Sequence, residues 1–81
     1  MKVHIQFFAT LRNYFHKSEQ EIEFSSPQSA KSIFKSLFDD QEIANRFLPS
    51  VRFAVNCEYV PPETLVNDGD ELALIPPVSG G

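Results

Sequence analysis

Apolar and polar residues alternate along several short stretches of the chain, and each stretch predicts a β-strand. In residues 2–8, the side chains of Val3, Ile5 and Phe7 fall on one face of such a strand. A period of two, with β-branched residues at apolar positions, is typical of a strand buried on one face only. The same pattern predicts four further strands, at residues 21–24, 51–55, 59–60 and 71–75.

A different spacing, with apolar residues three and four positions apart, predicts the main helix. The residues of this apolar stripe are Ala30, Ile33, Phe34, Leu37 and Phe38. Their spacing places them on one face of a helix. Ser26 is a good N-cap, and Pro27 fits the first helical position, where a missing N–H costs nothing. A second short helix is predicted at residues 41–47, and a short helical turn at residues 9–14.

Proline pairs and one turn sequence separate these elements. Pro61-Pro62 and Pro76-Pro77 end the strands before them, because proline cannot donate a ladder hydrogen bond. Residues 67–70 (NDGD) are typical of a turn in which Gly69 takes a positive φ. The resulting order is two strands, a main helix, a shorter helix and three strands.

This order predicts an α+β fold. A single amphipathic helix needs the face of a sheet to cover its apolar stripe. A mixed sheet of about five strands, curled around one main helix with a short second helix beside it, provides that face. This architecture is the β-grasp, or ubiquitin-like, roll. We therefore expect a β-grasp domain at residues 1–75 and an extended tail at residues 76–81.

The main helix covers one face of the sheet and leaves the other face open. Alternation assigns mostly small or polar residues to this outer face, but Phe8, Tyr59 and Ile75 are exceptions. If the strands pair as in a β-grasp roll, these three residues form one exposed apolar patch, and such patches commonly mark binding sites for partner proteins. The alternative is three scattered surface hydrophobes, which need no functional explanation.

Composition and charge exclude several classes of function. The chain has 81 residues, enough for one small domain, and a formal net charge of −4 at pH 7. This charge argues against a nucleic-acid binder, which needs a basic face, and favours a basic protein partner. No apolar stretch approaches the roughly 20 residues of a membrane span, so we expect a cytoplasmic protein that does not bind a membrane.

We expect no metal site, because His4 and His16 have no further ligands at metal spacing. Cys57 is the one cysteine and is expected to be an ordinary thiol.

The last six residues, Pro76 to Gly81 (PPVSGG), have an unusual chemistry. Two prolines fix φ near −65° and favour an extended path, so the segment reaches on the order of 20 Å. Gly80 and Gly81 carry no Cβ, which lets the backbone enter a slot too narrow for side chains. The carboxylate at Gly81 becomes an acylating group only after activation. The chain has no phosphate-binding glycine-rich loop, so another protein would have to activate it. The alternative is an inert glycine tail.

The chain carries five short segments that together form a pattern: Phe8-Ala9, Leu11-Arg12, Val55-Asn56, Asp68 to Glu71 and Pro76 to Gly81. In this pattern the chain resembles the MoaD-type small subunits of molybdopterin synthase. The resemblance covers the full length of the chain, and PPVSGG is its most specific part. The chain departs from the family pattern at residues 13–17, and residues 39–50 match no motif.

The resemblance implies a sulfur carrier that holds no cofactor and is not catalytic alone. An adenylating enzyme related to ubiquitin activators would consume ATP to adenylate Gly81, and a sulfur donor enzyme would supply the thiocarboxylate. The tail would then enter the large subunit of molybdopterin synthase, in an expected heterotetramer. There it would donate sulfur to cyclic pyranopterin monophosphate and form the molybdopterin dithiolene. Besides Gly80 and Gly81, the residues implied to contact partners are Phe8, Arg12, Tyr59, Ile75, Pro76, Pro77, Val78 and Ser79.

Two alternatives stay open at this point. Sulfur carriers for thiamin synthesis or tRNA thiolation, and protein-conjugating modifiers, share the Gly-Gly end but seldom the PPVSGG string. A non-catalytic ubiquitin-like binding module with an inert tail belongs to a different class of function. Activation of Gly81 by a partner enzyme separates the carriers from the module.

Overall fold

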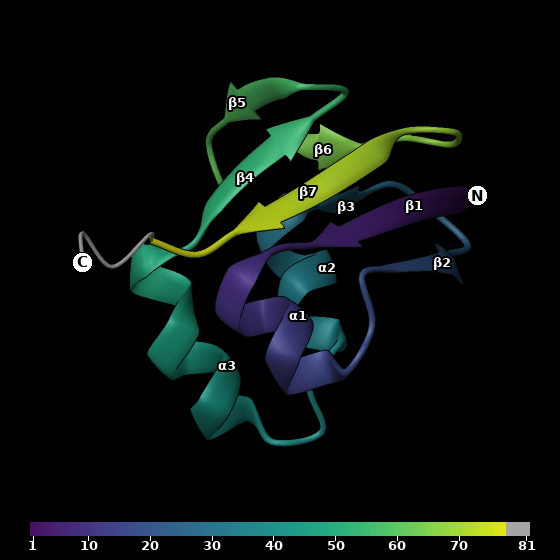
Figure 1. Ribbon diagram of the computed structural model, residues 1–81. Coiled ribbons are helices and arrows are strands. Elements are labelled where there is room, and N and C mark those ends of the chain that lie inside the picture. Colours follow the sequence, from purple (N-terminus) through teal and green to yellow (C-terminus); the bar gives the residue numbers. More distant parts are fainter. Residues whose placement is uncertain (78–81) are drawn as a thin grey trace.

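The computed structural model describes residues 1–77, and its main element is a five-stranded mixed sheet (Figure 1). The order across the sheet is β2-β1-β7-β4-β5. β1 and β7 are parallel, and the other neighbouring pairs are antiparallel. The last strand in the sequence therefore lies at the centre of the sheet. The strands are β1 (Lys2–Phe7), β2 (Glu19–Glu23), β4 (Arg52–Val55), β5 (Glu58–Val60) and β7 (Glu71–Ile75).

Helices gather on one face of this sheet (Figure 1). They are α1 (Ala9–Phe15), α2 (Ala30–Ser36) and α3 (Gln41–Phe47), each of seven residues, and the 3-10 helix η1 (Leu48–Ser50) follows α3. The predicted main helix, α2, is thus no longer than its neighbours, and the predicted helical turn after β1 is a helix of equal length. The predicted α+β fold of the β-grasp type is confirmed in its class and in its five-stranded mixed sheet.

The core lies between the inner face of the sheet and the helices, where alternation predicted it. Phe34 of α2 connects the helical side of the core to the sheet. The centroid of its ring lies 4.9 Å from that of Phe38 and 5.8 Å from that of Phe53 on β4. The ring centroid of Phe47 on α3 lies 5.9 Å from that of Phe38. Residues 39–50, which match no family motif, therefore still pack against the core. The buried residues of the inner sheet face are Val3, Ile5, Phe7, Val51, Phe53, Leu72 and Leu74.

The prediction that Ser26 caps the main helix is wrong. α2 begins at Ala30, and the hydroxyl oxygen of Ser29 accepts a hydrogen bond of 3.0 Å from the backbone N–H of Ser32. Ser29 also ends a short strand, β3 (Gln28–Ser29), which pairs with β6 (Leu65–Val66) in a separate two-stranded sheet. Pairing with a distant segment therefore overrides the local Ser-Pro signal.

A hydrogen-bond network fastens the turn before β7 to the rest of the sheet. The side-chain amide of Asn56 donates to the Asp70 carboxylate at 3.0 Å, and its carbonyl oxygen accepts from the backbone N–H of Glu71 at 3.0 Å. Asp70 also accepts from the backbone N–H of Asn67 at 2.8 Å. Gly69, with φ of 83°, donates its N–H to the carbonyl of Lys2. Residues that carry the family resemblance thus hold together the end of β7 that is remote from the tail.

Cys57 occupies a strained position in the hairpin between β4 and β5. Asn56 and Cys57 form its two-residue loop, with φ values of 50° and 72°. Two positive φ values are the signature of a type I′ turn, in which Asn-Gly is preferred because glycine adopts this conformation without steric cost. Replacing Cys57 with Gly is expected to raise the free energy of unfolding by about 0.5–1 kcal/mol, measured by urea denaturation.

The matched control for this prediction is Cys57→Ala, which removes the thiol but keeps the Cβ. Because Cys57 is exposed, loss of the thiol alone is expected to leave stability nearly unchanged. An alanine variant as stable as the glycine variant would show that backbone strain is not the cause.

Candidate functional site

The outer face of the sheet carries a shallow recess at the end where β7 finishes. Ile75, the last residue of β7, is partly buried, whereas Tyr59 on the edge strand β5 is 67% exposed. These two residues line the recess together with Arg52, Pro76 and Pro77. The structure therefore brings together four of the residues predicted to contact partners, and it adds Arg52 to them.

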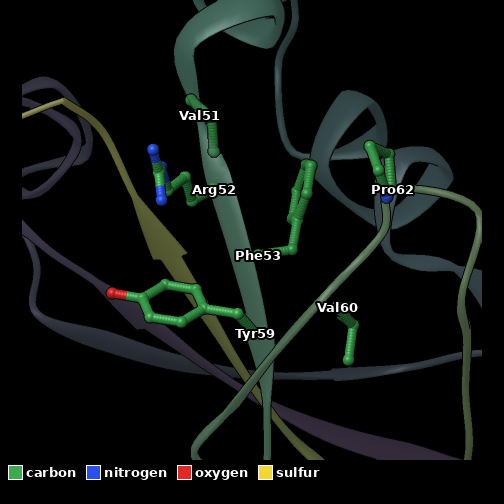
Figure 2. Close-up of a pocket in the computed structure, with 6 residues that line it drawn as sticks. All are labelled: Val51, Arg52, Phe53, Tyr59, Val60 and Pro62. Carbon is green, nitrogen blue, oxygen red and sulfur yellow. The ribbon is translucent and has the colours of Figure 1, made fainter.

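Strand register explains why these residues meet. Arg52 pairs with Ile75 across β4 and β7, and Tyr59 pairs with Ala54 across β5 and β4. Directly paired residues project from the same face of a sheet. Figure 2 shows the result, with Arg52 and Tyr59 on one side of β4 and Phe53 on the other.

Phe8 lies at the junction between β1 and α1. Its backbone is extended, with φ of −122° and ψ of 153°, so it continues the direction of β1. Phe7 pairs with Leu74 in the parallel ladder, and one further step along both strands brings Phe8 to the level of Ile75. The side chain of Phe8 is 42% exposed. Phe8 thus lies at the same end of the outer face as Ile75, and its role in partner binding stays a prediction.

The turn after Phe8 is strained and well anchored. Ala9 has a φ of 49°, which redirects the chain from β1 into α1. The carbonyl of Phe8 accepts hydrogen bonds from the backbone N–H groups of Leu11 and Arg12, and Leu11 is fully buried. Arg12 is exposed on α1, and its predicted contact with a partner stays a prediction.

The start of the tail is fixed to the body of the domain. The strand ends at Ile75, Pro76 after it is still buried, and Pro77 is exposed, so the chain reaches the surface of the domain between these two prolines. The predicted sites at Val78, Ser79, Gly80 and Gly81 lie outside the described residues. The division into a domain at residues 1–75 and a tail at residues 76–81 therefore stays a prediction.

The opposite edge of the same sheet is acidic. Glu19, Glu21 and Glu23 are the exposed residues of β2, and Oε1 of Glu19 lies 2.6 Å from Nε2 of His4 on β1.

Within residues 1–77, no three His, Cys, Asp or Glu side chains form a group that could hold a metal ion. No helix of this part of the chain is long and apolar enough to cross a membrane.

Comparison with known proteins places this chain in a family. The model of the ThiS family matches residues 5–81. The chain belongs to the ThiS family. It is 30% identical over 83 residues to a molybdopterin synthase sulfur carrier subunit from Chlamydomonas reinhardtii, with all of both proteins covered. It is 32% identical over 83 residues to the subunit of the same name from Pyrenophora tritici-repentis (strain Pt-1C-BFP), covering 95% of this chain and 87% of that protein. The predicted MoaD-type resemblance is confirmed.

Solved structures share the fold of this ThiS-family chain. SAMP1 from Haloferax volcanii superposes with a TM-score of 0.81 at 22% identity, over all of both chains. A chain in the complex of subunits 1 and 2 of the molybdopterin-converting factor from Helicobacter pylori 26695 gives a TM-score of 0.65 at 24% identity, again over all of both chains. At these identities the likeness establishes the fold.

Arg52 is the site residue that the sequence analysis did not single out. The signal was present, because alternation with Val51 and Phe53 already places Arg52 on the outer face. Its meeting with Ile75 depends on the pairing of β4 with β7, which is a property of the folded sheet.

Proposed function

We propose that this chain is the sulfur carrier subunit of a molybdopterin synthase and that Gly81 carries the sulfur as a thiocarboxylate. The observation that carries the proposal is the origin of the PPVSGG segment. It begins directly after the central strand β7, beside the recess lined by Tyr59 and Ile75. The names of the two curated relatives support the same function.

The proposed chemistry needs a partner enzyme for its first step. The Gly81 carboxylate attacks the α-phosphate of ATP and releases pyrophosphate, which gives an acyl-adenylate. Sulfide delivered by a donor enzyme then attacks the acyl carbon of Gly81, the acyl–phosphate bond breaks, and AMP leaves, so that the carrier ends in a thiocarboxylate. The sequence has no glycine-rich phosphate loop, so ATP binds to the activating enzyme and this chain holds no cofactor. The chain contributes the acyl group and the surface by which the enzyme recognises it.

The second step takes place in the large subunit of the synthase. A tail without side chains at Gly80 and Gly81 enters a narrow channel, while Phe8, Tyr59 and Ile75 dock outside it. The structure from Helicobacter pylori is a complex of two converting-factor subunits, which supports a partner of this kind. The activating enzyme uses the same face, so it must leave before the large subunit binds. We expect the assembled synthase to be a heterotetramer.

The test of this function is the intact mass of the chain after activation. Incubation with the cognate activating enzyme, ATP and sulfide is expected to add about 16 Da, because sulfur replaces one carboxylate oxygen. A reaction without ATP is the control and should leave the mass unchanged. An unchanged mass with a demonstrably active enzyme would favour the inert binding module.

Complementation separates the molybdopterin pathway from its relatives. Expression of the chain is expected to restore molybdopterin in a strain without its own sulfur carrier subunit. Rescue of a strain that lacks the thiamin carrier, or the tRNA thiolation carrier, in place of this one would assign the chain to that pathway.

A further inference from the structure

We infer that Arg52 determines how the carrier docks, and that the large subunit places a carboxylate against its guanidinium group. This inference rests on the proposed function, because it requires a large subunit to cover the outer face of the sheet. It concerns a residue outside the segments that carry the family resemblance, since those segments resume only at Val55.

The surroundings of Arg52 are apolar. It is the first residue of β4, is exposed, and lines the recess with Tyr59, Ile75, Pro76 and Pro77. Apart from the phenol hydroxyl of Tyr59, these neighbours offer no polar side-chain group. Figure 2 shows the guanidinium on the same side of β4 as the Tyr59 ring. In the described part of the chain, the one ion pair joins His4 to Glu19, so Arg52 has no anionic partner within residues 1–77.

Docking changes the environment of this cation. A partner that covers Tyr59 and Ile75 also removes water from Arg52, because the three side chains line one recess. Desolvation of an unpaired charge costs several kcal/mol, and apolar neighbours do not offset it. A bound large subunit must therefore supply an anion at this position. A carboxylate matches the planar fork of the guanidinium group and binds it through two parallel hydrogen bonds.

The phosphate of an adenylated tail does not fit this role. Six residues separate the end of β7 from the carboxyl group of Gly81, which corresponds to about 20 Å in an extended tail. This distance is several times the reach of an arginine side chain. The anion that meets Arg52 therefore belongs to the rim of the channel and not to the group at the tip of the tail.

Arg52 also makes the charge of the outer face asymmetric, with a cation near the tail and carboxylates at the far edge. The chain has a net charge of −4, and Glu19, Glu21 and Glu23 line the far edge of the same sheet, on β2. A partner with a carboxylate near the tail and basic groups over β2 fits in one orientation, and like charges oppose the reversed one. This orientation delivers the tail to the mouth of the channel.

The experiment measures the affinity of full-length variants for the cognate large subunit by calorimetric titration at low and high salt. Arg52→Met keeps the aliphatic stem and is expected to bind about 10-fold more weakly, with a smaller salt dependence. Arg52→Glu should lose about 100-fold, and Arg52→Lys should fall between Met and the wild type. Lys31→Glu, at an exposed position on α2, makes the same charge change on the helical side and should stay within about 2-fold.

Each outcome decides the inference. Wild-type affinity for Arg52→Met would overturn it, because the stem alone would then suffice. Equal losses for Arg52→Glu and Lys31→Glu would also overturn it, since net charge and not position would be the cause. A wild-type chain that gains the sulfur mass but does not bind the large subunit would overturn the inference together with the proposed synthase function. Circular dichroism of each variant confirms that it is folded before titration.

Discussion

Deletion of Gly81 is expected to abolish molybdopterin formation in a reconstituted system while the carrier still binds the large subunit. The deletion shortens the tail by one residue, or about 3.5 Å, and leaves Phe8, Tyr59 and Ile75 unchanged. A displacement of about 1 Å at a reacting group already costs on the order of 100-fold in rate. We therefore expect a loss of more than about 1,000-fold in molybdopterin formed per unit time.

The complementary variant carries one additional residue after Gly81 and should be equally inactive, because it moves the carboxylate too far. Affinity for the large subunit, measured in parallel, is the control that separates lost chemistry from lost docking. Full activity of either variant would refute the proposal that the sulfur is carried at Gly81.

Substitution of Phe8 by Asp is expected to weaken binding of the large subunit by about 100-fold with little change in stability. The substitution removes the contact area of the phenyl ring. It also places a carboxylate in the apolar patch, and this carboxylate must lose its water when the partner covers it. Phe8 is also the N-cap residue of α1 and makes no side-chain capping bond there. Aspartate is a favourable N-cap, so it offsets the packing lost with the ring, and we expect the free energy of unfolding to change by less than about 1 kcal/mol.

Leu65→Asp provides the matched control for this effect. Leu65 is 58% exposed on β6, in the separate two-stranded sheet, and lies outside the predicted patch. It therefore tests whether any new charge at an exposed apolar position weakens binding. Equal affinities for Phe8→Asp and Leu65→Asp, or an unchanged affinity for Phe8→Asp, would remove Phe8 from the docking surface.

The core and the order of the main elements follow from local patterns, which explains why the sequence predicts them. Period-two burial along β1 and β7 needs no knowledge of strand pairing, since each of these strands shows its own inner face. In β4 the pattern is broken, because Ala54 on the outer face is buried as well as Phe53. The apolar stripe of α2 is equally local. Of the predicted stripe, Ala30, Ile33, Phe34 and Phe38 are buried, whereas Leu37, the C-cap residue of α2, is half-buried.

Local patterns do not predict features that depend on pairing between segments far apart in the sequence. β3 and β6 have two residues each, too few to show a period, yet their pairing moves the start of α2 from Ser26 to Ser29. The recess around Arg52 likewise arises only when β4 pairs with β7 and β5. By contrast, the outer-face positions of Tyr59 within β5 and of Phe8 directly after β1 follow from local alternation, and both residues are exposed.

The central position of β7 has a mechanical consequence. A force applied to the tail pulls β7 along its own axis, between β1 on one side and β4 on the other. The hydrogen bonds of both ladders then bear the load together in shear, whereas an edge strand pulled sideways would open one bond at a time. The rate of forced unfolding is set by the barrier and not by the equilibrium stability. An enzyme that pulls on the carrier by its tail therefore pulls on a strand that is hydrogen-bonded to a neighbour on both sides.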